Sequence, residues 1–222
     1  MTEPELDELI SDCPRVYHMA ERGAWEGVKR HGLLSTSALL DLYQITGEER
    51  QRIENRHRPS IVVVSDKKLG KASIRDQIPM SDSGLMRALP EHISPADWYA
   101  RLNSKVFFWM SEARLLRLTS ARAYREIEHE VLVLDTRLLV SKFYNEIWLC
   151  PINSGCTKPM PHPRDFSTFQ RIGDYDYARW RLRRRRGERV VELCVDHSVH
   201  NVERFVVDAF IVRGEERLGK LF

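Results

Sequence analysis

Short runs of apolar residues, separated by polar and turn-forming segments, set the pattern of this chain. Runs rich in β-branched and aromatic residues, about four to eight residues long, are typical of buried strands. The pattern predicts strands at residues 16–18, 61–64, 105–109, 130–135, 147–150, 190–195 and 205–212.

Apolar residues at helical spacing, together with capping signals, predict the helices. Ser35 and Ser111 are expected to cap two helices, Gly32 to end one with a positive φ, and Pro95 to stand at the first position of another. Asp135 and Thr136 begin a short helical turn. The remaining predicted helices cover residues 5–10, 24–31, 48–55, 85–89, 168–172 and 175–186.

Helices and strands alternate irregularly along the chain, and no internal repeat is present. This order favours a mixed α+β domain over regular β-α-β winding. The length of 222 residues is enough for one sizeable domain, so residues 1–222 are expected to form a single unit.

The composition is that of a globular protein without a membrane-spanning helix. Hydrophobic residues make up 42% of the chain and charged residues 30%, and no apolar run approaches the roughly 20 residues that a membrane-spanning helix needs. The N-terminal segment 1–12 is acidic, unlike a secretory or transit peptide. We therefore expect a cytoplasmic protein with no membrane partner, whose four cysteines are reduced thiols.

A zinc site is one alternative use of the cysteines. Cys150, Cys156 and His162 are evenly spaced, and His197 and His200 follow. However, no paired Cys-x-x-Cys motif is present, and prolines make the segment a turn-rich loop. Ordinary packing and surface roles are favoured over zinc, and no metal site is predicted.

Glu192 is the first candidate for chemistry. It is a carboxylate inside an otherwise apolar strand, and a buried carboxylate needs either a compensating partner or a function. From the residues alone, the simpler reading that Glu192 faces solvent or pairs with an arginine is favoured. Glu130 is a rival at the start of another apolar strand, where the neighbouring charges indicate a surface position at strand entry.

Arg114 and His18 are the other candidates. Arg114 follows the aromatic strand and can clamp an anionic ligand, with Arg117 as a substitute one turn away. His18 stands at a strand end and can donate or accept a hydrogen bond to a sugar hydroxyl. For each, an ordinary structural role is the alternative, namely a surface ion pair for the arginine and packing for the histidine.

The net charge is only +3, but arginines are concentrated in one short segment. Such a cluster is typical of a phosphate-binding surface, and a solvated face is an equally good reading of a generic arginine run. Tyr175, Tyr177 and Trp180 are nearby and can stack on bases. The residues expected to bind nucleic acid are Arg179, Arg181, Arg183, Arg184, Arg185 and Arg186.

Taken in order, four segments resemble the DarT-type ADP-ribosyltransferases, which modify DNA bases using NAD. Residues 17–33, from Tyr17-His18 to Gly32-Leu33, are similar to their opening strand and helix. Residues 106–114 resemble their aromatic strand leading to a catalytic arginine. Residues 131–155 are similar to the segment that follows, and residues 190–195 resemble their last strand, which carries the catalytic glutamate.

The resemblance implies a fold, an activity and partners. The fold would be α+β of the ADP-ribosyltransferase type, with a central split antiparallel β core flanked by helices and an insertion at about residues 45–100. The chain would use NAD as co-substrate and transfer ADP-ribose to a base of DNA or RNA, as a toxin or phage-defence effector. An antitoxin or other regulatory protein would be a further partner.

The resemblance also assigns roles. Glu192 and Arg114 would be catalytic: the carboxylate would stabilise positive charge on the ribose and accept a proton, and the arginine would fix the pyrophosphate or the acceptor. The residues that would contact NAD are His18, Tyr17, Phe108, Trp109 and Asn153.

Two other functions remain open at this stage. The first is a catalytically inactive module on the same fold that binds nucleic acid or protein. The second, weaker, is RNA 2′-phosphotransferase chemistry, which also uses NAD but requires paired arginines on the phosphate, and no convincing pair is found in the sequence.

Overall fold

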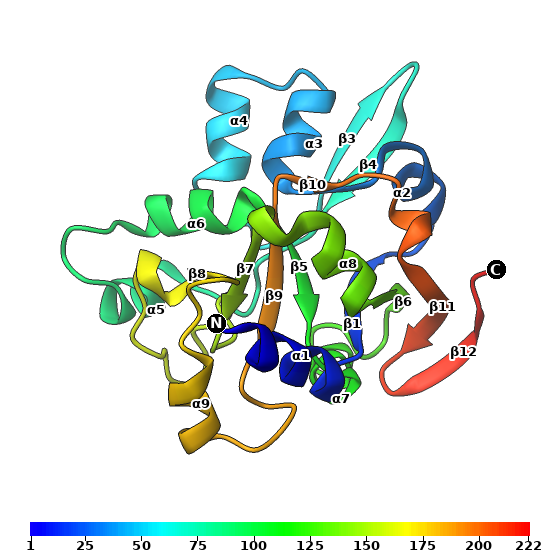
Figure 1. Cartoon of the computed structure of the whole chain (residues 1–222). Coiled ribbons are helices and arrows are strands. Elements are labelled where there is room, and N and C mark those ends of the chain that lie inside the picture. Colours follow the sequence, from blue (N-terminus) through cyan, green and yellow to red (C-terminus); the bar gives the residue numbers. More distant parts are fainter.

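One antiparallel sheet of eight strands organises the chain. The computed structural model describes residues 1–222, and the sheet runs through its middle (Figure 1). Two small ladders complete the β structure: β2 (Leu33–Leu34) pairs with β10 (Ser198–Val199), and β3 (Val62–Asp66) forms a hairpin with β4 (Gly70–Ile74). The strands of the main sheet lie in the spatial order β12 (Glu216–Lys220), β11 (Val206–Arg213), β6 (Glu128–Asp135), β1 (Arg15–Glu21), β5 (Lys105–Trp109), β9 (Glu192–Asp196), β7 (Ile147–Cys150) and β8 (Gln170–Arg171).

The main sheet is nearly divided between β1 and β5, at a place that we call the seam. β1 pairs along its length with β6, and β5 along its length with β9, but β1 and β5 share only one registered pair, Tyr17 opposite Trp109. The sheet therefore consists of two halves joined at one point. The α+β class with a split antiparallel core is confirmed.

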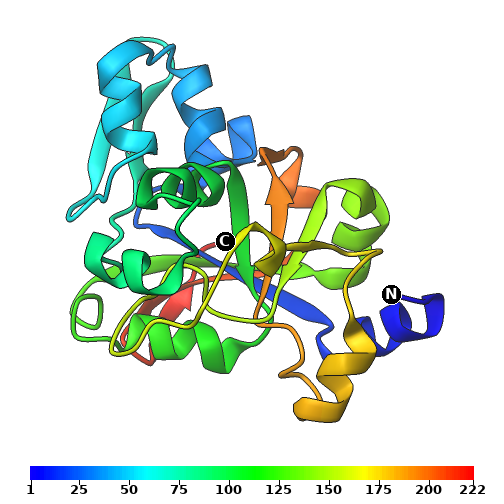
Figure 2. The ribbon, with the colours of Figure 1, turned by 90° about the vertical axis from the view of Figure 1, so that its left-hand side faces the viewer.

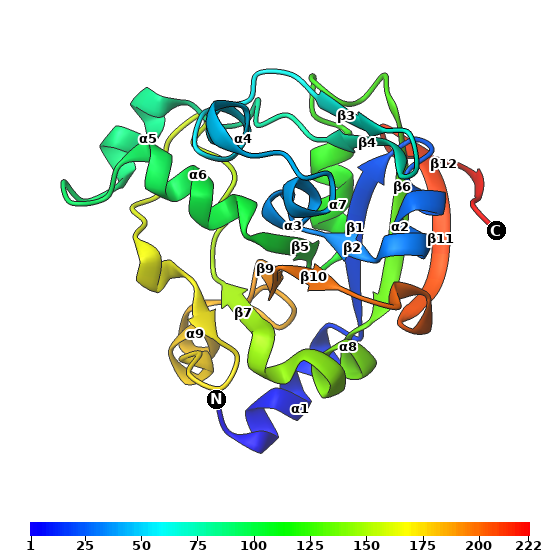
Figure 3. The same ribbon diagram turned by 90° about the horizontal axis from the view of Figure 1, so that it is seen from above.

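Helices cover both faces of the sheet (Figure 3). On one face lie α1 (Glu3–Asp12), α8 (Thr136–Phe143) and the short helix η3 (Val202–Arg204). On the other face, α7 (Glu112–Thr119) covers β1, β6 and β11, while α5 (Asp82–Ala88) and α6 (Pro95–Asn103) cover β5, β9 and β7. This explains why β6 reads as a continuous apolar run, because both of its faces are buried.

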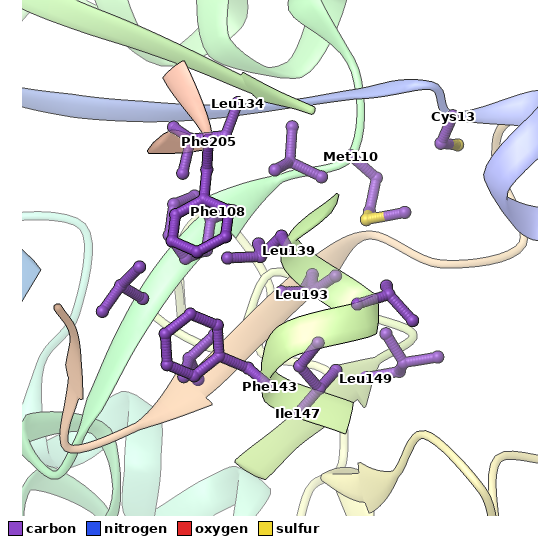
Figure 4. Packing of buried hydrophobic residues seen from close by; sticks show 14 of the residues in the cluster. Cys13, Phe108, Met110, Leu134, Leu139, Phe143, Ile147, Leu149, Leu193 and Phe205 are labelled. Carbon is purple, nitrogen blue, oxygen red and sulfur yellow. The ribbon is translucent and has the colours of Figure 1, made fainter. Parts of the chain in front are cut away.

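The largest apolar cluster lies between the sheet and α8 (Figure 4). Leu139 and Phe143 of α8 pack there against Leu149 and Leu193 from neighbouring strands. Phe108 belongs to the same cluster and is 1% exposed. β5 is thereby held between a buried core on one side and the seam at its edge.

Residues from the predicted insertion at 45–100 are divided between two places. α3 (Thr36–Leu42), α4 (Gly47–Glu54) and the β3–β4 hairpin form the upper end of the molecule in Figures 1 and 2 and share a small apolar cluster. Its buried members are Leu40, Ile53, Val64 and Ile74. α5 and α6 pack instead on the main sheet, so the segment is not a separate lobe.

Most of the predicted local signals are confirmed. Gly32 ends α2 (Trp25–His31) with φ +85°, and a Cβ there would lie 2.6 Å from the carbonyl oxygen of Val199. The hydroxyl of Ser35 accepts a hydrogen bond from the Ala38 N–H at the start of α3. Pro95 opens α6 at its first turn, where its missing N–H costs nothing.

Several local predictions were wrong. Ser111 does not cap α7, because its hydroxyl is buried without a hydrogen-bond partner. Residues 168–172 are not helical: the short helix η2 (Phe166–Thr168) ends there and β8 follows. β4 and β12 were missed because both are largely polar strands of hairpins and carry no apolar run. The other two elements are η1 (Tyr144–Glu146) and α9 (Tyr177–Arg183).

No helix of this structure combines the length and the apolar character required to cross a membrane.

The packing of α8 generates a stability prediction. Leu139 is fully buried, whereas the adjacent Leu138 on the same helix is 48% exposed. Leu139→Ala should lower the free energy of unfolding by about 2–5 kcal/mol, because it removes apolar contacts and leaves a cavity. Urea denaturation at fixed pH measures this. Leu138→Ala is the matched control and should change stability by less than about 0.5 kcal/mol; equal losses in both variants would contradict the packing described.

Candidate active site

A cavity of about 580 Å³ opens at the seam. Its walls come from β1, β5, α2, α3 and the β3–β4 hairpin, together with the loop after β7. This volume lies in the range of small-molecule and cofactor sites. Several residues chosen from the sequence line it: Tyr17, His18, Phe108, Trp109, Asn153 and Glu192. The early histidine and the late glutamate therefore meet in one cavity.

Glu192 is placed by strand register. It opens β9, where its neighbours across the sheet are Trp109 on β5 and Cys150 on β7. Its side chain is buried, with the residue 4% exposed. The main-chain N–H of Ser154 donates to both carboxylate oxygens at 3.2 Å. No arginine or lysine forms an ion pair with Glu192, so the reading of a solvent-facing or ion-paired side chain was wrong.

Burial controls the charge of Glu192. Removal from water raises the pKa of this carboxyl to about 7, and the contacts with Ser154 and Cys150 and the field of Arg164 oppose this only in part. A carboxyl with a pKa near neutrality can exist in either protonation state at physiological pH. Such groups are frequent at catalytic sites.

Arg164 positions the loop that carries Ser154. It is buried, and its guanidinium donates to the carbonyl oxygens of Ser154 at 2.8 Å, Cys156 at 2.8 Å and His162 at 2.9 Å. Neither Arg164 nor Ser154 was identified from the sequence. Their segment reads only as a proline-rich loop, and no spacing indicates that its backbone would meet Glu192.

His18 bridges the seam. Its Nδ1 lies 2.9 Å from the carbonyl oxygen of Phe107, and because a carbonyl can only accept, Nδ1 carries the proton. Burial lowers the pKa of His18 to about 4, so the ring is neutral at pH 7. Nε2 therefore has a free lone pair and makes no hydrogen bond within the protein. It is available to accept a hydrogen bond from a ligand hydroxyl.

The two aromatic candidates on β5 differ in access. Phe108 is part of the core, and its ring centroid lies 5.6 Å from that of His18. Trp109 is half-buried and lies beside Glu192 in register. Trp109 is therefore the better placed of the two to pack on a ligand ring, while Phe108 packs against the His18 ring.

Arg114 lies outside the cavity. It projects from α7 toward Glu188 and forms an ion pair with that carboxylate. Arg114 lies in the first turn of α7, and Leu118, one turn further along, is the residue of this helix that lines the cavity. The structure thus does not bring Arg114 together with Glu192.

The arginine segment also lies away from the cavity, and none of the six predicted arginines lines it. α9 is at the lower end of the molecule in Figures 1 and 2, opposite the β3–β4 hairpin. Acidic residues of α1 neutralise part of the segment: Glu8 pairs with Arg181, and Asp12 with Arg186. Arg184 donates to the Pro151 carbonyl at 2.5 Å.

Neither of the two tyrosines of this segment is accessible for stacking on bases. Tyr175 and Tyr177 are each 1% exposed, because they pack in the main apolar cluster. Trp180 is half-buried between the guanidinium groups of Arg179 and Arg184, whose carbons lie 5.7 Å and 4.2 Å from its ring. Arg179, Arg183 and Arg185 are exposed and form no ion pair.

Glu130 has a structural role. It is 1% exposed, so the expected surface position was wrong. It accepts hydrogen bonds from Arg22 Nη1 at 2.8 Å and from the main-chain N–H groups of Gly23 at 2.7 Å and Trp25 at 2.8 Å. Glu130 does not line the cavity, and its bonds fix the turn between β1 and α2.

The four cysteines are free thiols. Cys150 and Cys156 each hydrogen-bond a nearby carbonyl oxygen, of Ile152 and Lys158, at 3.2 Å. No group of three or more histidine, cysteine, aspartate or glutamate side chains is arranged to hold a metal ion.

Comparison with known families places the chain. Residues 14–206 match the model of a family of unknown function, DUF7002. The chain belongs to this family. No protein of curated function matches the DUF7002 chain. The matched range contains every residue that lines the cavity, whereas α1 and β12 of this DUF7002 member lie outside it.

The raised pKa of Glu192 predicts a pH-dependent stability of the DUF7002 chain. Between the ordinary pKa of a glutamate and about 7, the folded chain holds a proton that the unfolded chain releases, so stability falls as pH rises. Above pH 7 this costs on the order of 3 kcal/mol. Glu192→Gln removes the ionisation, so this variant should exceed the native chain in stability by that order at pH 8 and by little at pH 5.

Urea denaturation from pH 5 to pH 8 measures the difference. Glu130→Gln is the matched control, because it alters a buried carboxylate that has three donors and should destabilise the fold at both ends of the range. A stability difference between Glu192→Gln and the native chain that does not change with pH would contradict the assignment.

Proposed function

We propose that this chain is an NAD-dependent ADP-ribosyltransferase. The observation that carries the proposal is the meeting of His18 and Glu192 in one cavity at the seam of a split antiparallel sheet. The histidine is neutral and has a free nitrogen, and the glutamate is buried with a pKa of about 7. A cytoplasmic location, where NAD is available and thiols stay reduced, is part of the proposal.

The cavity residues suit NAD as a co-substrate. Trp109 offers an aromatic face for a ring, and His18 Nε2 offers an acceptor for a ribose hydroxyl. Positive side chains also stand in the cavity wall, at Lys71 and Arg75. A dinucleotide needs all three kinds of contact: an aromatic surface, polar groups for sugars and cations for phosphates.

Glu192 would carry the chemistry. ADP-ribosyl transfer breaks the bond between C1′ of the ribose and the nicotinamide nitrogen, whose electron pair leaves with neutral nicotinamide. A bond then forms from C1′ to a nitrogen or oxygen of the acceptor, which loses a proton. The ionised carboxylate of Glu192 stabilises the positive charge on the ribose, holds the 2′-hydroxyl and accepts that proton.

The acceptor that we propose is a nucleic acid. Three exposed arginines without ion pairs, Arg179, Arg183 and Arg185, are available for phosphate contacts on α9 and just after it. They lie in the segment that leads directly into β9. An acceptor strand bound there would continue toward the cavity along the loop that contains Pro151 and Ser154. Arg184 contacts this loop through its hydrogen bond to the Pro151 carbonyl oxygen.

A second candidate function is an inactive interaction module on the same fold. The ion pair of Arg114 with Glu188 favours it, because the arginine that the resemblance made catalytic is engaged outside the cavity. The two functions differ in whether the cavity takes up NAD.

The pKa of Glu192 predicts the pH dependence of transfer. The carboxylate form is required, so kcat/KM for NAD should rise with pH through about 7 and then level off. Glu192→Gln should lower the rate by about 10²–10⁴-fold while NAD still binds. His18→Ala should weaken NAD binding because it removes the free acceptor. Transfer of labelled ADP-ribose to DNA and RNA, and calorimetry with NAD, measure these effects.

Glu146→Gln serves as the control for this series, because Glu146 is exposed and outside the cavity. Undiminished transfer by Glu192→Gln would rule out the mechanism. Failure of the native chain to bind NAD would favour the inactive module.

The free arginines predict a salt-dependent affinity for single-stranded DNA or RNA. Replacing Arg179, Arg183 and Arg185 together by glutamine should reduce the slope of log K against log salt concentration by about 2, since each phosphate contact on a single strand contributes roughly 0.7. Fluorescence anisotropy with an oligonucleotide at several salt concentrations measures the slope.

The control for this triple variant removes the same charge elsewhere. Arg30, Arg52 and Arg204 are exposed, form no ion pairs and lie on other elements, so their triple replacement by glutamine should leave the slope unchanged. Equal effects of the two triple variants would show that only net charge matters and that α9 is not the contact surface.

A further inference from the structure

Of the two cations named in the cavity wall, Arg75 is the one that several parts of the fold hold in place. Arg75 follows directly after β4 in the hairpin and reaches across to the main sheet. Its Nη1 lies 2.9 Å from the Glu21 carboxylate of β1 and 3.4 Å from Nδ1 of His129 on β6. Its guanidinium carbon lies 5.2 Å from the centre of the Tyr124 ring. Three parts of the fold therefore hold this side chain in place.

These contacts leave most of its hydrogen-bonding capacity unused. Nε and Nη2 of Arg75 make no hydrogen bond within the protein, although the side chain is only partly exposed. A guanidinium has five N–H donors, arranged as a fork that matches the oxygens of a phosphate. Arg75 is thus oriented by one nitrogen and keeps the others free at the cavity wall.

Three other cations of the cavity lining, Arg22, Arg58 and Lys105, are already engaged. Arg58 is buried, and its donors go to the carbonyl oxygens of Ile53 and Arg75 and to the side chain of Asn103. Lys105 pairs with Asp196, and Arg22 with Glu128 and Glu130. Of the positive side chains in the lining, Lys71 alone has no ion pair and is exposed.

Lys71 and Arg75 share one side of the hairpin strand. Alternation along β4 places Lys71 and Ser73 on one face and Ala72 and Ile74 on the other, and Arg75 continues the first series. Ala72 and Ile74 pack in the apolar cluster of the upper end. Residues of both sides of the strand line the cavity: Lys71, Ser73 and Arg75 from the polar side, and Ala72 and Ile74 from the apolar side.

We propose that Arg75, assisted by Lys71, binds the diphosphate of the substrate. The inference rests on the proposed function in naming that substrate as NAD, and it transfers the phosphate-binding role from Arg114, which lies outside the cavity, to the β3–β4 hairpin. The hairpin is then a wall of the binding site, and the segment at residues 45–100 supplies a part that the rest of the fold lacks. Glu21 acts as a positioning residue, because its carboxylate holds the guanidinium.

The test uses the full chain and ADP-ribose, which carries the diphosphate but no nicotinamide, as the probe in calorimetry. Arg75→Gln should weaken ADP-ribose binding by about 10- to 100-fold, the range for loss of hydrogen bonds to a charged group. Arg75→Lys should restore only part of the affinity, because an ammonium cannot offer the fork. Lys71→Gln, at an exposed side chain that holds nothing in the fold, should weaken binding about threefold.

Two controls identify the source of the effect. Lys68→Gln removes a charge from the hairpin outside the cavity lining and should leave binding unchanged. Nicotinamide riboside, which has no phosphate, should bind the native chain and Arg75→Gln equally. Thermal unfolding of each variant establishes that the fold is intact, and Lys71→Gln remains informative if Arg75→Gln does not fold.

The outcomes separate this inference from the proposed function. ADP-ribose binding that depends on Arg75, in a chain that transfers nothing from NAD, would uphold the diphosphate site and reject the transferase. Normal transfer with unchanged ADP-ribose affinity in Arg75→Gln and Lys71→Gln would reject the diphosphate site and leave the transferase standing. A larger loss of ADP-ribose affinity in Arg114→Gln than in Arg75→Gln would also overturn the inference.

Discussion

The hydrogen bond from His18 to the Phe107 carbonyl is the interaction on which the seam and the cavity both depend. In a continuous sheet, a main-chain N–H of β1 would donate to this carbonyl, but β1 and β5 share only the pair Tyr17 and Trp109. The imidazole replaces the missing donor, so a polar group that would otherwise be unsatisfied is paired. Nδ1 of His18 thus pairs with the edge of β5, and Nε2 remains available to a ligand.

Two buried carboxylates of the sheet differ in the number of hydrogen-bond donors that surround them. Glu130 and Glu192 both stand on strands of the same sheet, and both are almost inaccessible to water. Glu130 is surrounded by three donors, one of them a guanidinium, and is committed to holding a turn. Glu192 has a single main-chain donor shared between its oxygens and faces a cavity. The carboxylate with fewer donors is the one whose pKa is raised to about 7.

The sequence predicted a site residue where the residues next to it in the chain are enough to mark it as unusual. Glu192 stands out because its strand is apolar. His18 was selected as the last residue of a short strand, but β1 continues to Glu21 and His18 lies in its middle. Arg75 was missed, since its importance depends on a polar hairpin strand reaching Glu21 across the fold. The roles of Arg181 and Arg186 were also beyond the sequence, because the carboxylates that neutralise them lie on the first helix, far away along the chain.

Strand β9 lies between β5 and β7 in the sheet, although it follows both of them in the chain. Until residues 192–196 leave the ribosome, the facing edges of β5 and β7 have no partner, and open edges invite association with other chains. Pairings so distant in sequence also form slowly. A nascent or shortened polypeptide would therefore lack the carboxylate and be prone to aggregate, and only a chain that includes β9 can assemble the cavity.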